Sequence, residues 1–197
     1  MVKAIIFDFD GVIHNTLEVA FEAQSKTLPG ITMEEYKSFF DGNIYTNKKI
    51  NSKTSNAYFS FVEEPFKKLR TRVEVKQELI QLNSNFQMFI ITSNKESLIN
   101  PYLLTNNLEV LFKEVLGKET HHSKIEKFSF LFKKYNLLKE DCIFITDTLG
   151  DILEANKVGL KTIAVDFGFH ERERLEKGNP FKIVSHFNEI LPLIKDL

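Results

Sequence analysis

The sequence predicts an α/β protein: a Rossmann-like, doubly wound parallel sheet with a helical segment inserted after the first strand. Short apolar runs typical of buried strands alternate with segments of helical periodicity from about residue 71 to the C-terminus. Strands separated by helices pair in parallel through right-handed crossovers. Residues 16–70 show mainly helical spacing, so we expect an insertion between the first strand and the rest of the sheet.

The predicted core comprises residues 1–15 and 71–197. Its apolar runs lack polar alternation, which indicates strands covered on both faces. The expected strands are Val2–Phe7, Phe86–Ile91, Leu111–Leu116 (a short strand or turn), Cys142–Thr146, Thr162–Val165 and an edge strand at Phe181–Val184. The expected helices are Val73–Leu82, Glu96–Thr105, Ser123–Tyr135, Ile152–Val158 and one at the C-terminus.

The insertion is expected to form short helices. Apolar residues recur at helical spacing from Leu17, and Pro29-Gly30 ends that segment. Thr32 and Glu35 indicate a capping box that begins a second helix. Further helices are expected over 46–52 and 56–69, with Pro65 breaking or kinking the last one.

Composition narrows the functional classes. A chain of 197 residues suits one domain with a modest insertion, and its formal net charge of −1 gives no electrostatic bias toward nucleic acid. No apolar run approaches the ~18 residues of a membrane span, and the N-terminus lacks the features of a signal peptide. The single cysteine, Cys142, cannot form an internal disulfide and is expected to be buried. We therefore expect a cytoplasmic monomer or weak dimer without nucleic-acid or membrane partners.

Two carboxylates, Asp8 and Asp10, directly follow the first strand and precede Gly11. Carboxylates near a buried strand are costly unless they are paired or bind a metal. A Mg²⁺ site that attacks phosphorus needs such a pair, one as nucleophile and metal ligand and its neighbour to handle the proton. A turn or N-cap aspartate is the alternative, but it does not explain the second pair, Asp147 and Asp151.

Polar residues follow two other predicted strands as well. Thr92-Ser93-Asn94 ends the second apolar run, and Asp147 and Asp151 follow the run that begins at Cys142. Lys124 begins a predicted helix that lies between these two runs in the sequence. Ligands of open α/β sheets bind outside the carboxyl ends of the strands. We therefore expect these side chains to meet there.

With these motifs, the chain resembles the haloacid dehalogenase (HAD) superfamily of phosphohydrolases over nearly its whole length, in its phosphoglycolate phosphatase and β-phosphoglucomutase-like branch. Asp8-Phe9-Asp10-Gly11-Val12 is similar to the first family motif, and Thr146-Asp147-Thr148-Leu149-Gly150-Asp151 to the acidic fourth motif. Thr92 and Lys124 look like the second and third motifs.

The resemblance implies a role for each matching residue. Asp8 would be the nucleophile and Asp10 the general acid and base, with the Asp10 backbone carbonyl on the metal. Asp147 would be a direct Mg²⁺ ligand, and Asp151 a direct or water-mediated one. Thr92, Ser93, Asn94 and Lys124 would bind the phosphate of the substrate. The insertion would be a cap that closes over the site.

The activity implied is Mg²⁺-dependent hydrolysis of a small phosphomonoester, such as phosphoglycolate or a sugar phosphate, through an aspartyl-phosphate. A phosphomutase of the same superfamily and a non-catalytic protein that binds a phosphorylated ligand remain alternatives. Asp10 argues against a carbon–halogen hydrolase, because such relatives lack this second aspartate.

Several assignments stay open. Lys118 is an alternative to Lys124 as the phosphate-site lysine, and Asp151 could instead cap a helix. His170 and the alternating charges after it indicate the start of a solvated helix. The basic residues between Thr46 and Arg72 could attract phosphorylated substrates or simply form a solvated helix face.

Overall fold

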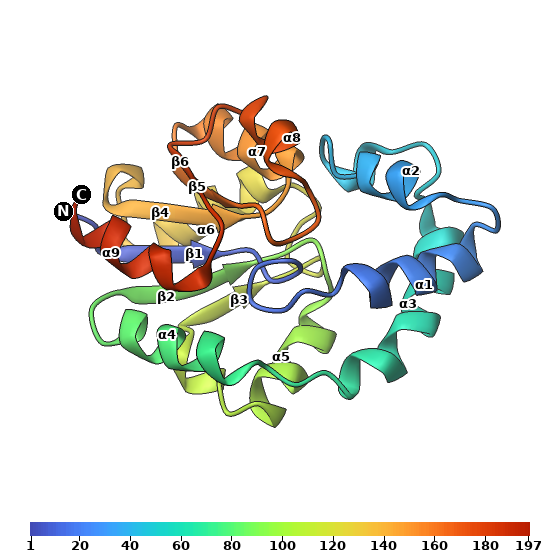
Figure 1. The fold of residues 1–197 in the computed structure, drawn as a ribbon, viewed down its shortest axis with the longest axis horizontal. Helices are drawn as coiled ribbons and strands as arrows, with labels where there is room; N and C mark the ends of the chain where they lie inside the picture. The colour runs from blue at the N-terminus through green and yellow to red at the C-terminus, as the bar shows by residue number, and fades with distance from the viewer.

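A six-stranded parallel sheet forms the centre of the computed structural model, which describes residues 1–197 (Figure 1). The strand order is β3-β2-β1-β4-β5-β6, and every neighbouring pair is parallel. The strands are β1 (Ala4–Phe7), β2 (Gln87–Ile91), β3 (Glu114–Leu116), β4 (Cys142–Thr146), β5 (Lys161–Val165) and β6 (Lys182–Val184). The order turns back between β1 and β4, so the topological switch point lies at their carboxyl ends. The predicted fold class is confirmed.

Helices cover both faces of this sheet. Successive side chains of a strand point to opposite faces, so Ile5 and Phe7 pack into one hydrophobic cluster while Ala4 and Ile6 pack into another. The first cluster includes residues from α4 (Val73–Asn83), α5 (Glu96–Thr105) and α9 (Ile190–Lys195). The second includes residues from α6 (Lys124–Tyr135) and α7 (Leu149–Val158). The short α8 (Arg172–Glu176) packs through Leu175 on the outer part of the sheet.

Three helices lie between β1 and α4 in the sequence: α1 (Leu17–Thr27), α2 (Met33–Ser38) and α3 (Ser52–Lys67). They stand beyond the end of the sheet toward which β1 runs (Figure 1). Ala20 of α1 and Tyr36 of α2 form a small buried cluster with Phe39 and with Phe169 from the loop after β5. This cluster joins the inserted helices to the sheet at the carboxyl ends of its strands.

The helix boundaries of the insertion differ in part from the expectation. The helix predicted over 46–52 is wrong: the chain forms a 3₁₀ turn at Ile44–Thr46, and α3 begins at Ser52. The reason is a capping box, in which Asn51 Oδ1 accepts from Thr54 N and Asn51 N donates to Thr54 Oγ1. Pro65 lies in the last turn of α3, which ends at Lys67.

Two further features bear on the expectations. Cys142 is a free, buried cysteine, as predicted. Among the helices of the structure, none combines the length and the apolar character needed to cross a membrane.

Candidate active site

The carboxyl ends of β1, β2 and β4 bring Asp8, Thr92 and Asp147 together at the switch point of the sheet. All three side chains are buried. A small cavity of about 30 Å³ lies between Asp8 and Thr92, and its walls also include Asp10, Ser93 and Asp151. The residues predicted from separate motifs therefore share one site.

Asp8 is held by an ammonium and by the main chain. Its Oδ2 lies 3.0 Å from Lys124 Nζ, and its Oδ1 accepts a hydrogen bond of 2.7 Å from Phe9 N. The same Lys124 Nζ lies 2.6 Å from Asp151 Oδ2, which also accepts from Thr146 Oγ1 at 2.6 Å. Asp151 is the third residue of α7 and makes no capping hydrogen bond.

The structure distinguishes the two candidate lysines. Lys124 Nζ lies between Asp8 and Asp151, whereas Lys118 Nζ donates to Ser55 Oγ of α3 at 2.6 Å. Lys124, not Lys118, is therefore placed to neutralise charge next to Asp8.

A second buried lysine, Lys127, bonds main-chain carbonyls next to the site. Lys127 Nζ donates to the carbonyl oxygens of Thr92 at 2.5 Å and of Gly117 at 3.2 Å. Lys124, Lys127, Phe128 and Leu131 form the buried stripe of α6, at the spacing of one helix face. The sequence prediction missed Lys127, although a lysine three residues after Lys124 on this stripe was the available signal.

Asp10 is oriented by two neighbours. Its carboxylate accepts from Thr16 Oγ1 at 2.6 Å and from Asn94 Nδ2 at 3.1 Å. The Asn94 amide is thus engaged with the Asp10 carboxylate and does not stand free to bind phosphate. Thr92 Oγ1 accepts from Asn94 N at 3.0 Å, which leaves the Thr92 hydroxyl proton available to another acceptor.

Asp147 has a carboxylate oxygen without a partner. Its Oδ2 accepts from Phe169 N at 2.7 Å, but Oδ1 is buried and has no hydrogen bond. Two glycines make room for this side chain: a Cβ on Gly11 would lie 1.7 Å from Asp147 Oδ2, and one on Gly168 would lie 2.3 Å from it. An orphaned buried carboxylate oxygen needs a cation or a donor.

The electrostatics of the site also favour a cation. Burial raises the pKa of Asp8 although Lys124 opposes the rise, and burial likewise raises the pKa values of Asp10 and Asp147. Burial also acts on Asp151, but the attraction of Lys124 outweighs it and lowers the pKa of Asp151. A single ammonium thus faces several carboxylates, and a divalent cation would favour their ionised forms.

Mg²⁺ fits this donor set. No three His, Cys, Asp or Glu side chains form a closed metal cluster. Mg²⁺ keeps several waters and is commonly bound through one or two carboxylates, so Asp8 and Asp147 suffice as side-chain ligands. The Asp10 carbonyl and Asp151 are the further groups predicted to complete the site.

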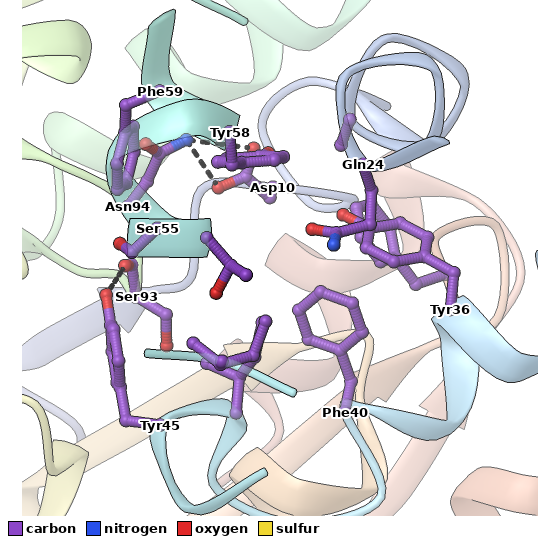
Figure 2. Close-up of a pocket in the computed structure, with 15 residues that line it drawn as sticks. Asp10, Gln24, Tyr36, Phe40, Tyr45, Ser55, Tyr58, Phe59, Ser93 and Asn94 are labelled. Atoms are coloured by element: carbon purple, nitrogen blue, oxygen red, sulfur yellow. Dashed lines mark hydrogen bonds between the residues drawn. The ribbon is translucent and has the colours of Figure 1, made fainter. Parts of the chain in front are cut away.

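A larger cavity, of about 80 Å³, lies between the inserted helices and the core (Figure 2). It shares Asp10, Ser93, Phe40 and Phe169 with the small cavity, so the two spaces adjoin. Most of its lining residues are hydrophobic. Sequence reasoning did not identify this cavity, because its walls come from helix faces that look like ordinary core faces.

Hydrogen bonds that involve main-chain atoms join the insertion to the core. Gly150 N donates to Phe40 O at 2.8 Å, and Tyr45 Oη donates to Ser93 O. His170 accepts from Leu149 N at 3.0 Å through Nδ1, so its Nε2 carries the proton that bonds Lys37 O at 3.0 Å. His170 is buried, so the prediction that it begins a solvated helix is wrong for this residue. The helix itself begins at Arg172.

The fold and these motifs together define an α/β protein with a carboxylate-based site at the switch point of its sheet. The model of the haloacid dehalogenase-like hydrolase family matches residues 5–165. The chain belongs to this family, and the family expected from the motifs is confirmed.

Several curated relatives are named phosphoglycolate phosphatase, and another, from Caldanaerobacter subterraneus, is named a putative pyrophosphatase. The phosphoglycolate phosphatase of Colwellia psychrerythraea is 26% identical over 126 residues, which cover 62% of this chain and 56% of that protein. The phosphoglycolate phosphatase of Aliivibrio fischeri is 24% identical over 98% of this chain and 96% of its own length. The chain thus spans about half the length of the first relative and nearly the whole of the second.

Solved structures show the same fold. A haloacid dehalogenase-like hydrolase from Streptococcus pneumoniae superposes with a TM-score of 0.84 at 21% identity, over 98% of each chain. At this identity the similarity concerns the fold.

Proposed function

We propose that the protein is a Mg²⁺-dependent phosphatase that hydrolyses small phosphomonoesters through an aspartyl-phosphate on Asp8. One observation carries the proposal: the buried Asp8 carboxylate is fixed by Lys124 Nζ and Phe9 N, and it faces a small cavity that Thr92 also lines. The family membership and the names of the relatives support phosphate-ester hydrolysis.

In the first step, an Asp8 oxygen attacks phosphorus while the bond between phosphorus and the ester oxygen breaks. Asp10, in its protonated form, gives its proton to the leaving alkoxide. Burial raises the pKa of Asp10, which favours the protonated form needed here. Lys124 and the Thr92 hydroxyl stabilise the negative charge of the transferring phosphoryl group.

In the second step, the Asp10 carboxylate takes a proton from water. The water oxygen attacks phosphorus, and the bond between phosphorus and Asp8 breaks to release phosphate and restore Asp8. Thr16 and Asn94 hold the Asp10 carboxylate for both proton transfers. The chain thus supplies the nucleophile, the proton shuttle and the anion donors from the ends of two strands and from one helix.

The groups that would hold Mg²⁺ are the side chains of Asp8 and Asp147 and the Asp10 carbonyl. Asp151 would bind it directly or through water. When bound, Mg²⁺ would neutralise charge on the phosphoryl oxygens and orient them for in-line attack.

The setting proposed for this activity is the cytoplasm, where the partner is a small phosphorylated metabolite and the protein acts as a monomer or weak dimer. The free, buried Cys142 is compatible with a reducing compartment. Phosphoglycolate, named for the relatives, and sugar phosphates form the starting set of substrates. The basic residues between Thr46 and Arg72 are exposed and none lines either cavity, which supports a solvated helix face.

The test is phosphate release from a panel of small phosphomonoesters, with Mg²⁺ or with a chelator, by the wild type and by Asp8→Asn. We expect Mg²⁺-dependent release that Asp8→Asn lowers at least about 1,000-fold, since the amide is not a nucleophile here. Asp196→Asn, at an exposed position, is the matched control and should keep full activity. An active Asp8→Asn enzyme would refute the nucleophile, and isomerisation that requires a bisphosphate would show a mutase instead.

A further inference from the structure

The larger cavity has a lining suited to an uncharged group. Nine of its 15 lining residues are hydrophobic, and Asp10 is the only ionisable side chain at neutral pH among them. Burial raises the pKa values of Tyr36, Tyr45 and Tyr58, so these phenols stay neutral. Aromatic residues form much of the wall, namely Tyr36, Phe40, Tyr45, Tyr58, Phe59 and Phe169. The cavity adjoins Asp10, the group that would protonate the leaving alcohol, so the alcohol part of a substrate would lie in this cavity.

The lining contains no lysine or arginine that could pair with an anion. The ammonium of Lys118 bonds Ser55 Oγ and lies 4.9 Å from the centre of the Phe59 ring, but Lys118 itself does not line the cavity. A carboxylate or second phosphate in this space would be desolvated next to Asp10 without a cation. The cavity therefore disfavours an anionic leaving group such as that of phosphoglycolate.

Several polar side chains of the lining are already engaged. Tyr45 Oη donates to Ser93 O, Asn94 Nδ2 donates to Asp10, and Thr54 Oγ1 donates to Lys49 O. These three groups are therefore not free to bind the hydroxyl groups of a sugar.

Gln24 is different. It lies on α1, is 2% exposed, and its Nε2 has no hydrogen-bond partner. Figure 2 shows its amide reaching into the cavity on the side of Tyr36. A buried amide donor without a partner is unfavourable, so this group points to an acceptor supplied by a ligand.

We propose that the preferred substrate is the phosphate monoester of a small, uncharged, ring-bearing primary alcohol, whose hydrogen-bond acceptor pairs with Gln24. This inference rests on the proposed phosphatase function and names the substrate class of the same site. A space of about 80 Å³ is smaller than the apolar cavity of about 150 Å³ that holds benzene, so the leaving group can be no larger than one small ring. The aromatic walls suit the flat faces of such a ring.

Three esters of primary alcohols test the proposal: pyridylmethyl phosphate, benzyl phosphate and phosphoglycolate. The first has a ring and an acceptor, the second has a ring alone, and the third has a carboxylate. With the wild-type enzyme and Mg²⁺, slightly above neutral pH, we expect kcat/KM to fall in this order, by about tenfold or more from the first to the last.

The Gln24→Leu variant tests the acceptor. Loss of the amide should lower the ratio of kcat/KM for pyridylmethyl over benzyl phosphate about fivefold, because the benzyl ester offers no acceptor. The ratio cancels any general loss of folded enzyme. Gln81→Leu, an exposed glutamine in α4, is the matched control and should leave the ratio unchanged.

The outcomes separate this inference from the proposed function. Preference for phosphoglycolate over both ring esters, or an unchanged ratio in Gln24→Leu, would overturn the inference while the phosphatase activity stands. Dependence of phosphoglycolate turnover on Lys118, seen with Lys118→Met, would locate the anion site that the inference denies. Wild-type protein that releases phosphate from no ester would refute the proposed function, and the inference would fall with it.

Discussion

The two adjoining cavities differ in construction. The small one is walled mainly by carboxylate and hydroxyl side chains that follow strand ends, and two of its carboxylates, Asp8 and Asp151, face Lys124. The larger one is walled mainly by apolar and aromatic side chains, many of them from the inserted helices. Under the proposed function, the core would perform the reaction and the insertion would select the alcohol that leaves. Variants in each region should therefore have different signatures.

The largest effect is expected for Lys124→Met. The change leaves Asp8 and Asp151 buried without their ammonium and removes a charge from the phosphoryl site. We expect kcat/KM to fall about 1,000-fold for every ester, with the order of substrates unchanged. Steady-state kinetics on the three esters, with circular dichroism to verify folding, measures this.

Lys133→Met, at an exposed position of the same helix, is the control for Lys124→Met and should match the wild type. A change in substrate order in Lys124→Met would mean that the two cavities do not act separately.

Gly11→Ala should have the next largest effect. Gly11 has a φ of +77°, and its added Cβ would collide with the Asp147 carboxylate. We expect kcat/KM to fall about 100-fold and the Mg²⁺ concentration for half-maximal activity to rise. A Mg²⁺ titration of activity measures both.

Gly30→Ala separates the collision from backbone strain. Gly30 also has a positive φ, of +89°, but its added Cβ meets nothing within 4 Å. It should lose stability without a change in the Mg²⁺ requirement. Equal Mg²⁺ curves for both alanine variants would contradict the assignment of Asp147 to the metal.

The smallest effect on activity is expected for Lys127→Met, because Lys127 bonds main-chain carbonyls and does not line the small cavity. The change leaves the Thr92 carbonyl without its side-chain donor and removes the shorter of two hydrogen bonds to the Gly117 carbonyl, so it should lower the free energy of unfolding by about 1–3 kcal/mol at neutral pH. Substrate order should stay the same.

The pH dependence of this loss is also predicted. Burial lowers the pKa of Lys127 from 10.5 to about 8, so between these values the unfolded chain binds more protons than the folded one. The wild type therefore gains stability relative to Lys127→Met as pH rises from about 8 to about 10.5. Urea unfolding of both proteins across this range measures the difference, and a constant difference would show that Lys127 does not titrate with a lowered pKa.

The sequence predicted the residues around the small cavity far better than those around the larger cavity. Strands are marked by continuous apolar runs, and Asp8 and Asp147 stand directly after such strands, where the parallel topology brings them together. The boundaries of β4 and α5 match the expectation residue for residue. Lys124 could not be separated from Lys118 by spacing alone, because only the packing of α6 shows which ammonium reaches Asp8.

The insertion was harder to predict for a physical reason. Gln24 and Tyr58 sit on amphipathic helices whose apolar faces look the same whether they meet a core or a cavity. Their role depends on how α1 and α3 pack, which local pattern does not encode. The error over residues 46–52 arose from overlooking Asn51, whose side chain fixes the start of α3.

Asp147 sits between two residues that have no room for a side chain. A single methyl group at Gly11 or Gly168 would overlap its carboxylate, so three distant positions of the chain are tied to one another by space alone. Substitutions at these three positions should therefore be correlated in evolution. In relatives that keep the aspartate, both glycines are expected to persist, and in lineages that abandon it, both are expected to drift. An alignment would then show these three positions as a covarying triplet.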